Sequence, residues 1–377
     1  MKRRAMIMAA MVTVTMGAWV AVAGAQSAAG GRSGGVAGAR GNVTPARGAV
    51  KKPSYKVTRL NPINNKISQS SSPMGINDDG VVVGRGTVDD EGRQGPLHAV
   101  MWAPSKPATD LGTLAGPTRI SQATAINNKN QIVGRTQITH GDEAPFGAFF
   151  KDGNGKMEVL GEEWADVVAI NDAGQVVGNL AGKAMLWEKG KPGQDIGTIG
   201  GLGNTYAEAL AINNLGQVVG DGAVASGHGL LPFIWDARNG IKKIDIFPDC
   251  ESGRPLAINN KGVVVGTCTL ANRVDGSRGF IWDSEKGMRG LAPLKPDTLN
   301  TIAYGINDEG QIVGQSGGRA VVYIEGVLFD LNDVAKGAKG AITEARKINN
   351  KGQIIAVDMM GGILLTPDGP AAPRGAR

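Results

Sequence analysis

The decapeptide AINNLGQVVG at residues 211–220 decides the fold of this chain, because close variants of it occur seven times. The seven copies place an Ile-Asn pair at residues 76–77, 126–127, 170–171, 212–213, 258–259, 306–307 and 348–349. Successive Asn residues are separated by 50, 44, 42, 46, 48 and 42 positions. A repeat of this length is typical of a four-stranded propeller blade and also of some helical arrays.

The local chemistry of each copy predicts a β-hairpin. A short apolar run leads into Asn-(Asn/Asp)-x-Gly, and β-branched residues follow, which is the order strand, tight turn, strand. Asn suits the first position of a type I turn, because its side chain can bond the backbone two residues on. Gly suits the left-handed position that follows. Asn130 replaces this Gly in the second copy, and Asn also tolerates a positive φ.

Two further strand signals recur between the hairpins. The first usually ends in an aromatic residue and occurs at 98–102, 147–150, 184–187, 232–235, 279–282, 320–323 and 363–365. The second follows a polar turn and occurs six times, at 110–114, 157–160, 195–199, 243–246, 288–291 and 327–331. The missing seventh stands at 55–60. The sequence therefore predicts an all-β, seven-bladed β-propeller with four-stranded blades, whose N-terminal strand closes the last blade and removes exposed sheet edges.

The two ends of the chain differ from this body. Residues 1–25 are typical of a secretory signal peptide, with Lys2, Arg3 and Arg4 before an apolar run and Ala23-Gly24-Ala25 at the cleavage site. An uncleaved membrane anchor is the alternative. We expect a flexible Gly/Ala/Arg-rich linker at 26–52, the propeller at 53–366 and a disordered tail at 367–377. The expected location is secreted, periplasmic or at the cell surface.

The charge balance argues against nucleic acid as a partner. Of the 40 Lys and Arg residues, eight lie in residues 1–50 and 367–377, whereas only one of the 34 Asp and Glu residues, Asp368, lies there. The body therefore keeps 32 basic and 33 acidic residues. A body with this balance is a poor phosphate binder. We expect no nucleic acid partner, no membrane association after signal cleavage, and a monomer.

The repeated pattern resembles the HAF family of bacterial extracellular repeat proteins. The best matches are His98-Ala99-Val100-Met101-Trp102, then Asp110-Leu111-Gly112-Thr113-Leu114, and the decapeptide at 211–220. The resemblance covers essentially all of residues 55–366. It implies export and a propeller-like fold, without a known activity. The His of the pattern occurs only as His98, which argues against a repeated role for this residue.

The order of strands indicates which face carries function. If the Ile-Asn strand is innermost, the Asn turns share one face with other short turns. The longer connections share the opposite face, at 85–97, 136–146, 221–230 and 267–278, with 115–122 and 200–207 between blades. Function concentrates in loops on a rigid scaffold. The candidate binding residues on this long-loop face are Asp89, Asp90, Arg93, His140, Asp142, His228 and Arg273.

The sequence contains little that indicates catalysis, and we predict no catalytic residues, no cofactor and no metal site. The Asn turns lack the alternating acidic ligands of a calcium loop, and Lys129, Lys261 and Lys351 inside three of them would repel a cation. No common nucleophile motif occurs. Trp102, Trp187, Trp235 and Trp282 recur at equivalent positions. They could form a sugar platform, but repetition favours packing between blades.

The two cysteines, Cys250 and Cys268, flank the fifth hairpin. The hairpin register places residue 268 opposite about residue 253, close to Cys250, so a disulfide is plausible in an exported protein. It would stabilise the fold by about 3 kcal/mol in the chain-entropy account. Two free thiols are the alternative.

Together these features predict an exported, non-catalytic recognition module. We expect it to bind a polysaccharide or a surface protein through the long-loop face. The alternative is a propeller-type glycan hydrolase or lyase that uses loop carboxylates, because such a site assembles from distant blades and can be hidden in one sequence. Two carboxylates at glycosidase separation near the central channel would favour this alternative.

Overall fold

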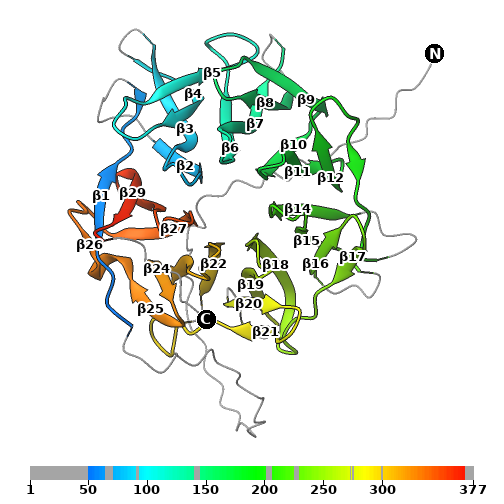
Figure 1. Cartoon of the computed structure of the whole chain (residues 1–377), viewed down its shortest axis with the longest axis vertical. Coiled ribbons are helices and arrows are strands. Elements are labelled where there is room, and N and C mark those ends of the chain that lie inside the picture. Colours follow the sequence, from blue (N-terminus) through cyan, green and yellow to red (C-terminus); the bar gives the residue numbers. More distant parts are fainter. Residues whose placement is uncertain are drawn as a thin grey trace, which may run out of the picture. The chain divides into compact units, whose positions relative to one another are not determined.

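The fold is a ring of seven antiparallel sheets (Figure 1), which confirms the predicted seven-bladed propeller. The computed structural model describes residues 50–63, 71–90, 93–139, 145–200, 206–224, 229–271, 273, 276–298 and 300–369. The predicted signal at 1–25, most of the predicted linker and the tail from residue 370 lie outside this part of the chain. Within the described residues, no helix has the length and apolar character needed to cross a membrane.

Each blade has four strands, numbered here from the centre of the ring outward. Blade 1 contains β2 (Ser71–Ile76), β3 (Val82–Asp90), β4 (Arg93–Trp102) and β5 (Thr109–Gly112). Blade 2 contains β6 (Ser121–Ile126), β7 (Gln131–Gln137), β8 (Phe146–Asp152) and β9 (Met157–Glu163). Blade 3 contains β10 (Asp166–Ile170), β11 (Gln175–Leu180), β12 (Lys183–Glu188) and β13 (Gln194–Asp195).

The next three blades repeat this order. Blade 4 contains β14 (Ala207–Ile212), β15 (Val218–Gly222), β16 (Leu231–Asp236) and β17 (Gly240–Lys243). Blade 5 contains β18 (Cys250–Ile258), β19 (Val264–Leu270), β20 (Ser277–Asp283) and β21 (Gly287–Gly290). Blade 6 contains β22 (Thr301–Ile306), β23 (Ile312–Ser316), β24 (Arg319–Ile324) and β25 (Val327–Asp330), after which a short 3-10 helix spans Leu331–Asp333.

Blade 7 joins the two ends of the described chain. Its strands β27 (Ile342–Ile348), β28 (Ile354–Asp358) and β29 (Gly361–Pro367) are completed by β1 (Tyr55–Arg59), which pairs antiparallel with β29. The short β26 (Ala335–Lys336) then pairs parallel with β1 on the outside. Arg59 also donates two hydrogen bonds, of 2.7 and 2.6 Å, to the Asp358 carboxylate. The N-terminal strand therefore closes the last blade, as predicted.

The turn after each inner strand has the predicted geometry. In blade 4, the N–H of Gly216 donates to the carbonyl of Asn213 at 3.1 Å, which closes the turn. The Asn213 side-chain oxygen accepts from the N–H groups of Leu215 and Gln217 at 3.1 and 2.9 Å. Gly216 has a φ of 76°, and Asn130 at the same place in blade 2 has a φ of 60°. Both residues are therefore in the left-handed region, as the sequence predicted.

The side-chain amides of the seven repeated Asn residues join the blades in a closed cycle. Each Nδ2 donates to the backbone carbonyl of the equivalent Asn in the next blade, at 2.9 to 3.2 Å. The cycle closes from Asn349 of blade 7 to Asn77 of blade 1 at 2.9 Å. All seven Asn residues are buried. This satisfies buried polar groups that would otherwise cost free energy.

A second cycle involves the residue after each repeated Asn. Its backbone N–H donates to the side-chain Oδ1 of the equivalent residue in the next blade, at 2.8 to 2.9 Å, in all seven blades. Asp and Asn share this position, and no two Asp residues occupy neighbouring blades. The amide of Asn128, for example, donates to carboxylates on both sides, Asp78 and Asp172, each at 3.1 Å. Both amino-acid types therefore serve the same interblade bond.

Asn130 compensates for a change in the neighbouring blade. In five blades the Asn amide also donates to a Gln four residues on, as Asn171 does to Gln175 at 2.8 Å. Blade 1 has Val81 at that position, and there Asn77 donates instead to Oδ1 of Asn130 at 3.0 Å. The exception in the second repeat is thus paired with an exception in the first.

We predict that Gly310→Asn stabilises the propeller by about 1 kcal/mol. Blade 5 also lacks the Gln, because Val263 occupies its position. Gly310 in blade 6 has a φ of 78°, and a Cβ there would have no neighbour within 4 Å. The side-chain oxygen of an Asn at this position can therefore accept a hydrogen bond from the Asn259 amide, as the oxygen of Asn130 does from Asn77. Chemical denaturation measures the change.

Gly216→Asn is the matched control for this substitution. A Cβ at Gly216 would lie 3.4 Å from Oε1 of Gln175, which already occupies the acceptor position. We expect no gain in the free energy of unfolding from this variant. Equal gains from both variants would show that reduced freedom of the unfolded chain, and not the amide contact, is responsible.

The hydrophobic core consists of seven clusters, and each lies between two neighbouring blades. Between blades 1 and 2, for example, Val83 and Ala99 pack with Ala123, Ile132 and Phe149. Four tryptophans that recur in the third strands take part in these clusters, namely Trp102, Trp187, Trp235 and Trp282. Their contacts match the packing interpretation of this repeat.

The last Gly of the decapeptide is needed because the inner strand is irregular. In every blade the register shifts three residues before the repeated Asn. A Cβ on the facing Gly, Gly220 in blade 4, would lie 1.9 to 2.1 Å from a carbonyl oxygen of the inner strand in six blades. Blade 7 has Ala356 there, and a second register shift directly precedes Glu344. The backbone of blade 7 thus differs where the others need glycine.

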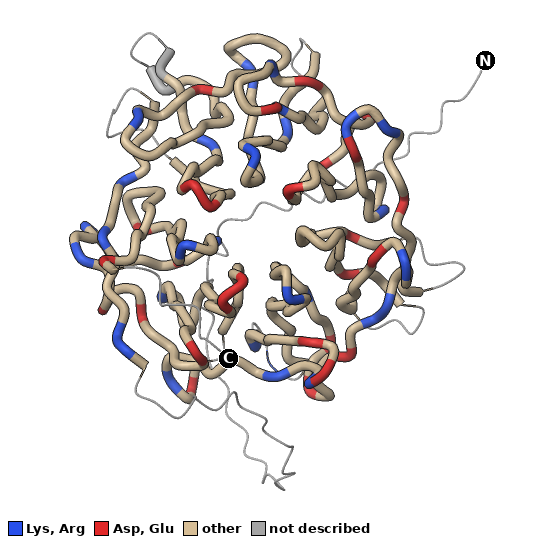
Figure 2. Tube along the Cα trace, in the orientation of Figure 1, with Lys and Arg blue, Asp and Glu red and all other residues tan. Residues whose placement is uncertain are grey.

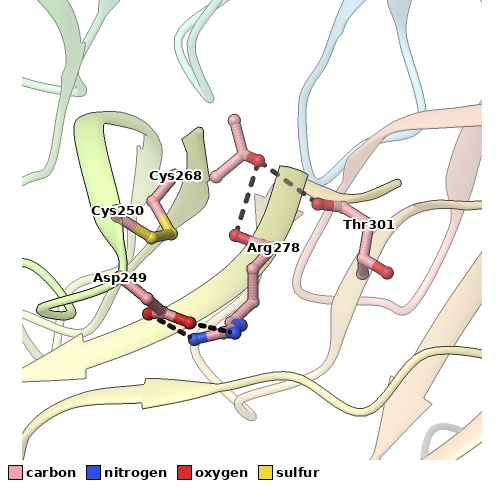
Figure 3. The surroundings of a disulfide bond; sticks show 6 residues. Asp249, Cys250, Cys268, Arg278 and Thr301 are labelled. Atoms are coloured by element: carbon pink, nitrogen blue, oxygen red, sulfur yellow. Dashed lines mark hydrogen bonds and ion pairs between the residues drawn. A yellow bond between two sulfur atoms is a disulfide. The ribbon is translucent and has the colours of Figure 1, made fainter. Parts of the chain in front are cut away.

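Blade 5 contains the disulfide bond (Figure 3). Cys250 and Cys268 are bonded, with Cα atoms 5.9 Å apart. Residue 268 pairs with Gly253 across the two strands, which matches the register inferred from the sequence. Beside the disulfide, Arg278 donates to both carboxylate oxygens of Asp249, at 3.0 and 2.7 Å. The bond therefore fastens the start of β18 to the loop-side half of β19.

Candidate functional site at the loop face of the ring

The inner strands end in two different surroundings. We call the end with the seven Asn turns the turn face, and the opposite end, where each inner strand begins, the loop face. At the turn face a central depression is lined by the Ile-Asn-Asx segment of every blade. Its polar side chains bond one another in the two cycles described above. The turn face therefore holds the blades together.

Charge at the turn face follows the same structural logic. Acidic residues occupy the turns of blades 1, 3 and 6, and a lysine occupies those of blades 2, 5 and 7 (Figure 2). Lys351 of blade 7 lies 3.9 Å from Asp79 of blade 1. Opposite charges thus face each other across neighbouring blades. Within the described residues, no group of three or more His, Cys, Asp or Glu side chains is arranged to hold a metal ion.

The loop face differs from blade to blade at equivalent positions. Five residues before the repeated Asn, the seven inner strands carry Ser72, Gln122, Asp166, Glu208, Arg254, Ile302 and Glu344. In six blades a Cβ on the facing residue of the second strand would collide with the backbone carbonyl oxygen of this residue, so that the facing residue is Gly. The close approach therefore constrains the main chain and leaves the side chain free to vary. We call these seven residues the loop-face ring.

A hydrogen-bonded network crosses from blade 4 to blade 5 at this ring. Arg254 donates to Glu208 at 2.9 Å and to Asp221 at 2.8 Å. Glu208 and Asp221 are direct partners across β14 and β15, and the hydroxyl of Tyr206 donates to Glu208 at 2.7 Å. One guanidinium thus holds two carboxylates close together.

The network places Asp221 in an unusual electrostatic environment. Its side chain is 1% exposed, whereas those of Glu208 and Arg254 are 16% and 35% exposed. Burial, together with the charge of Glu208, raises the pKa of Asp221 to about 7, against the attraction of Arg254. Burial and the charge of Glu208 therefore favour the neutral form of Asp221, and Glu208 is the more accessible carboxylate.

Two arginines, from blades 7 and 1, donate hydrogen bonds to residues of the next blade along the ring. Arg346 donates to the hydroxyl of Ser72 at 2.8 Å, and Ser72 is the strand partner of Arg85. Arg85 donates to Gln122 at 3.2 Å. Burial lowers the pKa of the Arg85 guanidinium, and the charges of Arg135 and Arg346 lower it further. The loop face therefore has a basic sector beside the carboxylates of blades 3 and 4.

Blade 7 also has an extra cation at its inner strand. Lys347 stands two residues before Asn349, where the other six blades have only Gly or Ala. Burial lowers the pKa of the Lys347 amine. The repeat does not require a charged residue at this position.

The sequence-based site residues are only partly placed by the structure. His140, Asp142 and His228 lie outside the described residues. Arg273 is exposed in the connection after β19. Asp89 and Asp90 end β3, and Arg93 begins β4, with Asp90 and Arg93 paired across the strands. The expected loop at 85–97 is therefore largely an extended hairpin, because the strands continue pairing beyond the blade.

Sequence reasoning missed Tyr206, Glu208, Asp221 and Arg254. The sequence predicts a loop at 221–230, but Asp221 belongs to β15 and accepts a hydrogen bond from Arg254. A signal for two of these residues exists in the sequence. Glu208 and Arg254 are charged at ring positions where other repeats have Ser, Gln or Ile, and comparing the seven repeats column by column identifies both.

His98 has a structural role beside this face. Its ring is 3% exposed, and Nδ1 lies 2.8 Å from Asp110 while Nε2 lies 2.9 Å from the carbonyl of Pro117. Burial alone lowers the pKa of His98, but Asp110 and the carbonyl acceptors outweigh it, so that the pKa lies above its ordinary value. Two acceptors favour the form with protons on both nitrogens.

We predict that His98→Gln destabilises the protein more at pH 5.5 than at pH 9. The raised folded pKa means that the stability from His98 is fully present below the unfolded value of about 6.5. It is lost as the pH rises through the folded pKa. Thermal unfolding of both proteins at the two pH values measures the difference. The Asp110→Asn background should remove most of this pH dependence, and an equal loss at both pH values would contradict the prediction.

Comparison with known proteins supports the fold only. No protein-family model matches the sequence, and no curated protein is significantly similar to it. A structure reported for two prolyl endopeptidases has a TM-score of 0.53 at 10% identity, covering 81% of this chain and 51% of that chain. Streptogramin B lyase has a TM-score of 0.51 at 9% identity, covering 84% and 98%.

A third similar structure is the extracellular domain of a one-component system from B. thetaiotaomicron. Its TM-score is 0.51 at 10% identity, and the match covers 84% of this chain and 40% of that chain. At such identities the likeness concerns the fold alone, which hosts many unrelated functions. The resemblance to the HAF family remains a prediction.

Proposed function

We propose that this propeller is an exported, non-catalytic recognition module that binds a polysaccharide or a surface protein through its loop face. The observation that carries this proposal is the contrast between the two faces. The turn face repeats the same residues in all blades and uses them to bond one blade to the next. The side chains of the loop-face ring differ from blade to blade, although in six blades the same close approach of a glycine constrains the main chain. Side chains that the fold does not require are the ones available for a ligand.

The state of the carboxylates favours recognition over hydrolysis. Asp221 is almost fully buried, and Arg254 binds both Asp221 and Glu208. A general acid must reach the oxygen that it protonates, which Asp221 cannot do while its side chain is covered. Fixed, mutually bonded charges instead offer hydrogen bonds in a set geometry, which lowers the entropic cost of binding.

Three features support the rest of the proposal. The signal-like residues 1–25 support export, and the disulfide between Cys250 and Cys268 suits an oxidising compartment. The near balance of charge in residues 51–366 argues against a nucleic acid partner. The N-terminal strand completes the last blade, so that the closed ring leaves only short sheet edges, in keeping with a monomer.

Affinity electrophoresis against a panel of soluble polysaccharides, with an assay for new chain ends, tests this function. We expect retention by at least one polysaccharide and no new chain ends. Glu208→Gln should weaken retention about tenfold, because a charged hydrogen bond at the loop face is weakened. Lys261→Ala at the turn face should leave retention unchanged.

Equal effects of the two substitutions would contradict the choice of face. Release of new chain ends would contradict the non-catalytic role. It would support a glycan hydrolase or lyase, a second candidate favoured by the raised pKa of Asp221 beside Glu208. If no polysaccharide is retained, a surface protein is the remaining partner class, and the same two variants serve for pull-down from envelope proteins.

A further inference from the structure

Trp164 is the tryptophan of the described residues that stands outside the repeat. The four tryptophans of the third strands pack between blades. Trp164 instead lies between β9 and β10, two residues before Asp166 of the loop-face ring, and it is 57% exposed. A large aromatic side chain left in water at this position does not serve the core.

The backbone at Trp164 is also strained. Its φ is 68°, in the left-handed region that bulky residues rarely adopt. The N–H of Trp164 donates to the carbonyl of Phe146 at 2.9 Å, which holds this conformation. Glycine would adopt the same φ without cost. An exposed tryptophan retained at a strained position points to a function that needs its ring.

Tyr206 occupies the equivalent position in the next blade. It stands two residues before Glu208, as Trp164 stands two before Asp166, and it is 36% exposed. Its ring lies beside Gly182 of blade 3, whose added Cβ would be 3.5 Å from the ring. Its hydroxyl donates to Glu208, which Arg254 holds in turn. Tyr206 is therefore an exposed ring in a fixed orientation.

We propose that Trp164 and Tyr206 form a stacking platform for the pyranose rings of a neutral polysaccharide. This inference rests on the proposed function and names the ligand class and the residues. The inner strands β10 and β14 that follow the two rings contact each other. The exposed Asp166 and the partly exposed Glu208 stand beside the platform. Sugars present an apolar C–H face for stacking and hydroxyl groups that donate to carboxylates.

The charged groups beside Trp164 and Tyr206 indicate which class of ligand can stack on the two aromatic rings. Three carboxylates, from Asp166, Glu208 and Asp221, lie in blades 3 and 4, where the charge of Arg135 acts on Asp166 and Arg254 bonds Glu208 and Asp221, so acidic and basic groups are close to balance beside the rings. Single-stranded nucleic acids also stack on aromatic rings, but they need a basic groove for their phosphates. The carboxylate that bonds the Tyr206 hydroxyl is Glu208, which would repel the anionic groups of an acidic polysaccharide stacked on that ring. A neutral glycan fits both the rings and the carboxylates.

Isothermal titration of the purified protein with neutral oligosaccharides tests the platform. The probes are β-1,4-linked oligomers of glucose, mannose and N-acetylglucosamine. We expect one series to bind, and Trp164→Ala to weaken that binding about tenfold. Trp164→Phe should retain binding within about threefold. Leu215→Ala, which removes an apolar side chain 67% exposed at the turn face, is the matched control and should bind normally.

Trp164→Gly separates loss of the platform from loss of the fold. Glycine relieves the strained φ, so we expect this variant to unfold at no lower temperature than the parent protein while binding falls as in Trp164→Ala. Oligosaccharide binding that is unchanged in Trp164→Ala and Trp164→Gly would overturn the platform while leaving the proposed recognition function intact. Binding of acidic polysaccharides or a surface protein, with no neutral glycan bound, would also overturn it. Absence of any loop-face ligand would overturn the recognition function itself.

Discussion

The hydrogen bond from each repeated Asn amide to the next Asn carbonyl is the interaction on which the ring depends. It joins residues 42 to 50 positions apart in six cases, and in the seventh it joins Asn349 to Asn77. The acceptor oxygen belongs to the turn itself, so turn geometry and blade spacing are set together. A residue without an amide N–H could form the turn but could not make the bond to the next blade. This explains why Asn is present in all seven turns.

Because of this cycle of amide hydrogen bonds, the two faces of the ring have different roles. Bonds between blades occupy the turn face, so its side chains have little freedom to change. At the loop face the close approach of Gly220 and its equivalents needs only main-chain atoms. Side chains there carry charge in one blade and none in another, as Glu208 and Ile302 illustrate. A rigid and repetitive scaffold thereby supports an asymmetric surface.

Departures from the repeat are explained by contacts between neighbouring blades. Val81 removes an acceptor from blade 1, and Asn130 of blade 2 restores it. Ala356 replaces the strand glycine where the inner strand of blade 7 has a second register shift. Trp164 departs from the repeat with no structural partner of this kind, and it is exposed. A departure that the neighbouring blade does not explain is therefore the more informative guide to function.

The sequence by itself determined the seven blades, the closure by residues 55–60, the left-handed Asn130 and the packing of the four repeated tryptophans. These features follow from turn chemistry and alternation within short segments, and repetition shows each of them several times. Only the tertiary structure decided that Arg254 meets Glu208 and Asp221, that β3 and β4 extend as a hairpin through Asp90 and Arg93, and that Trp164 remains in water. Such contacts depend on how one blade is oriented against the next, and that orientation exists only when the ring is closed.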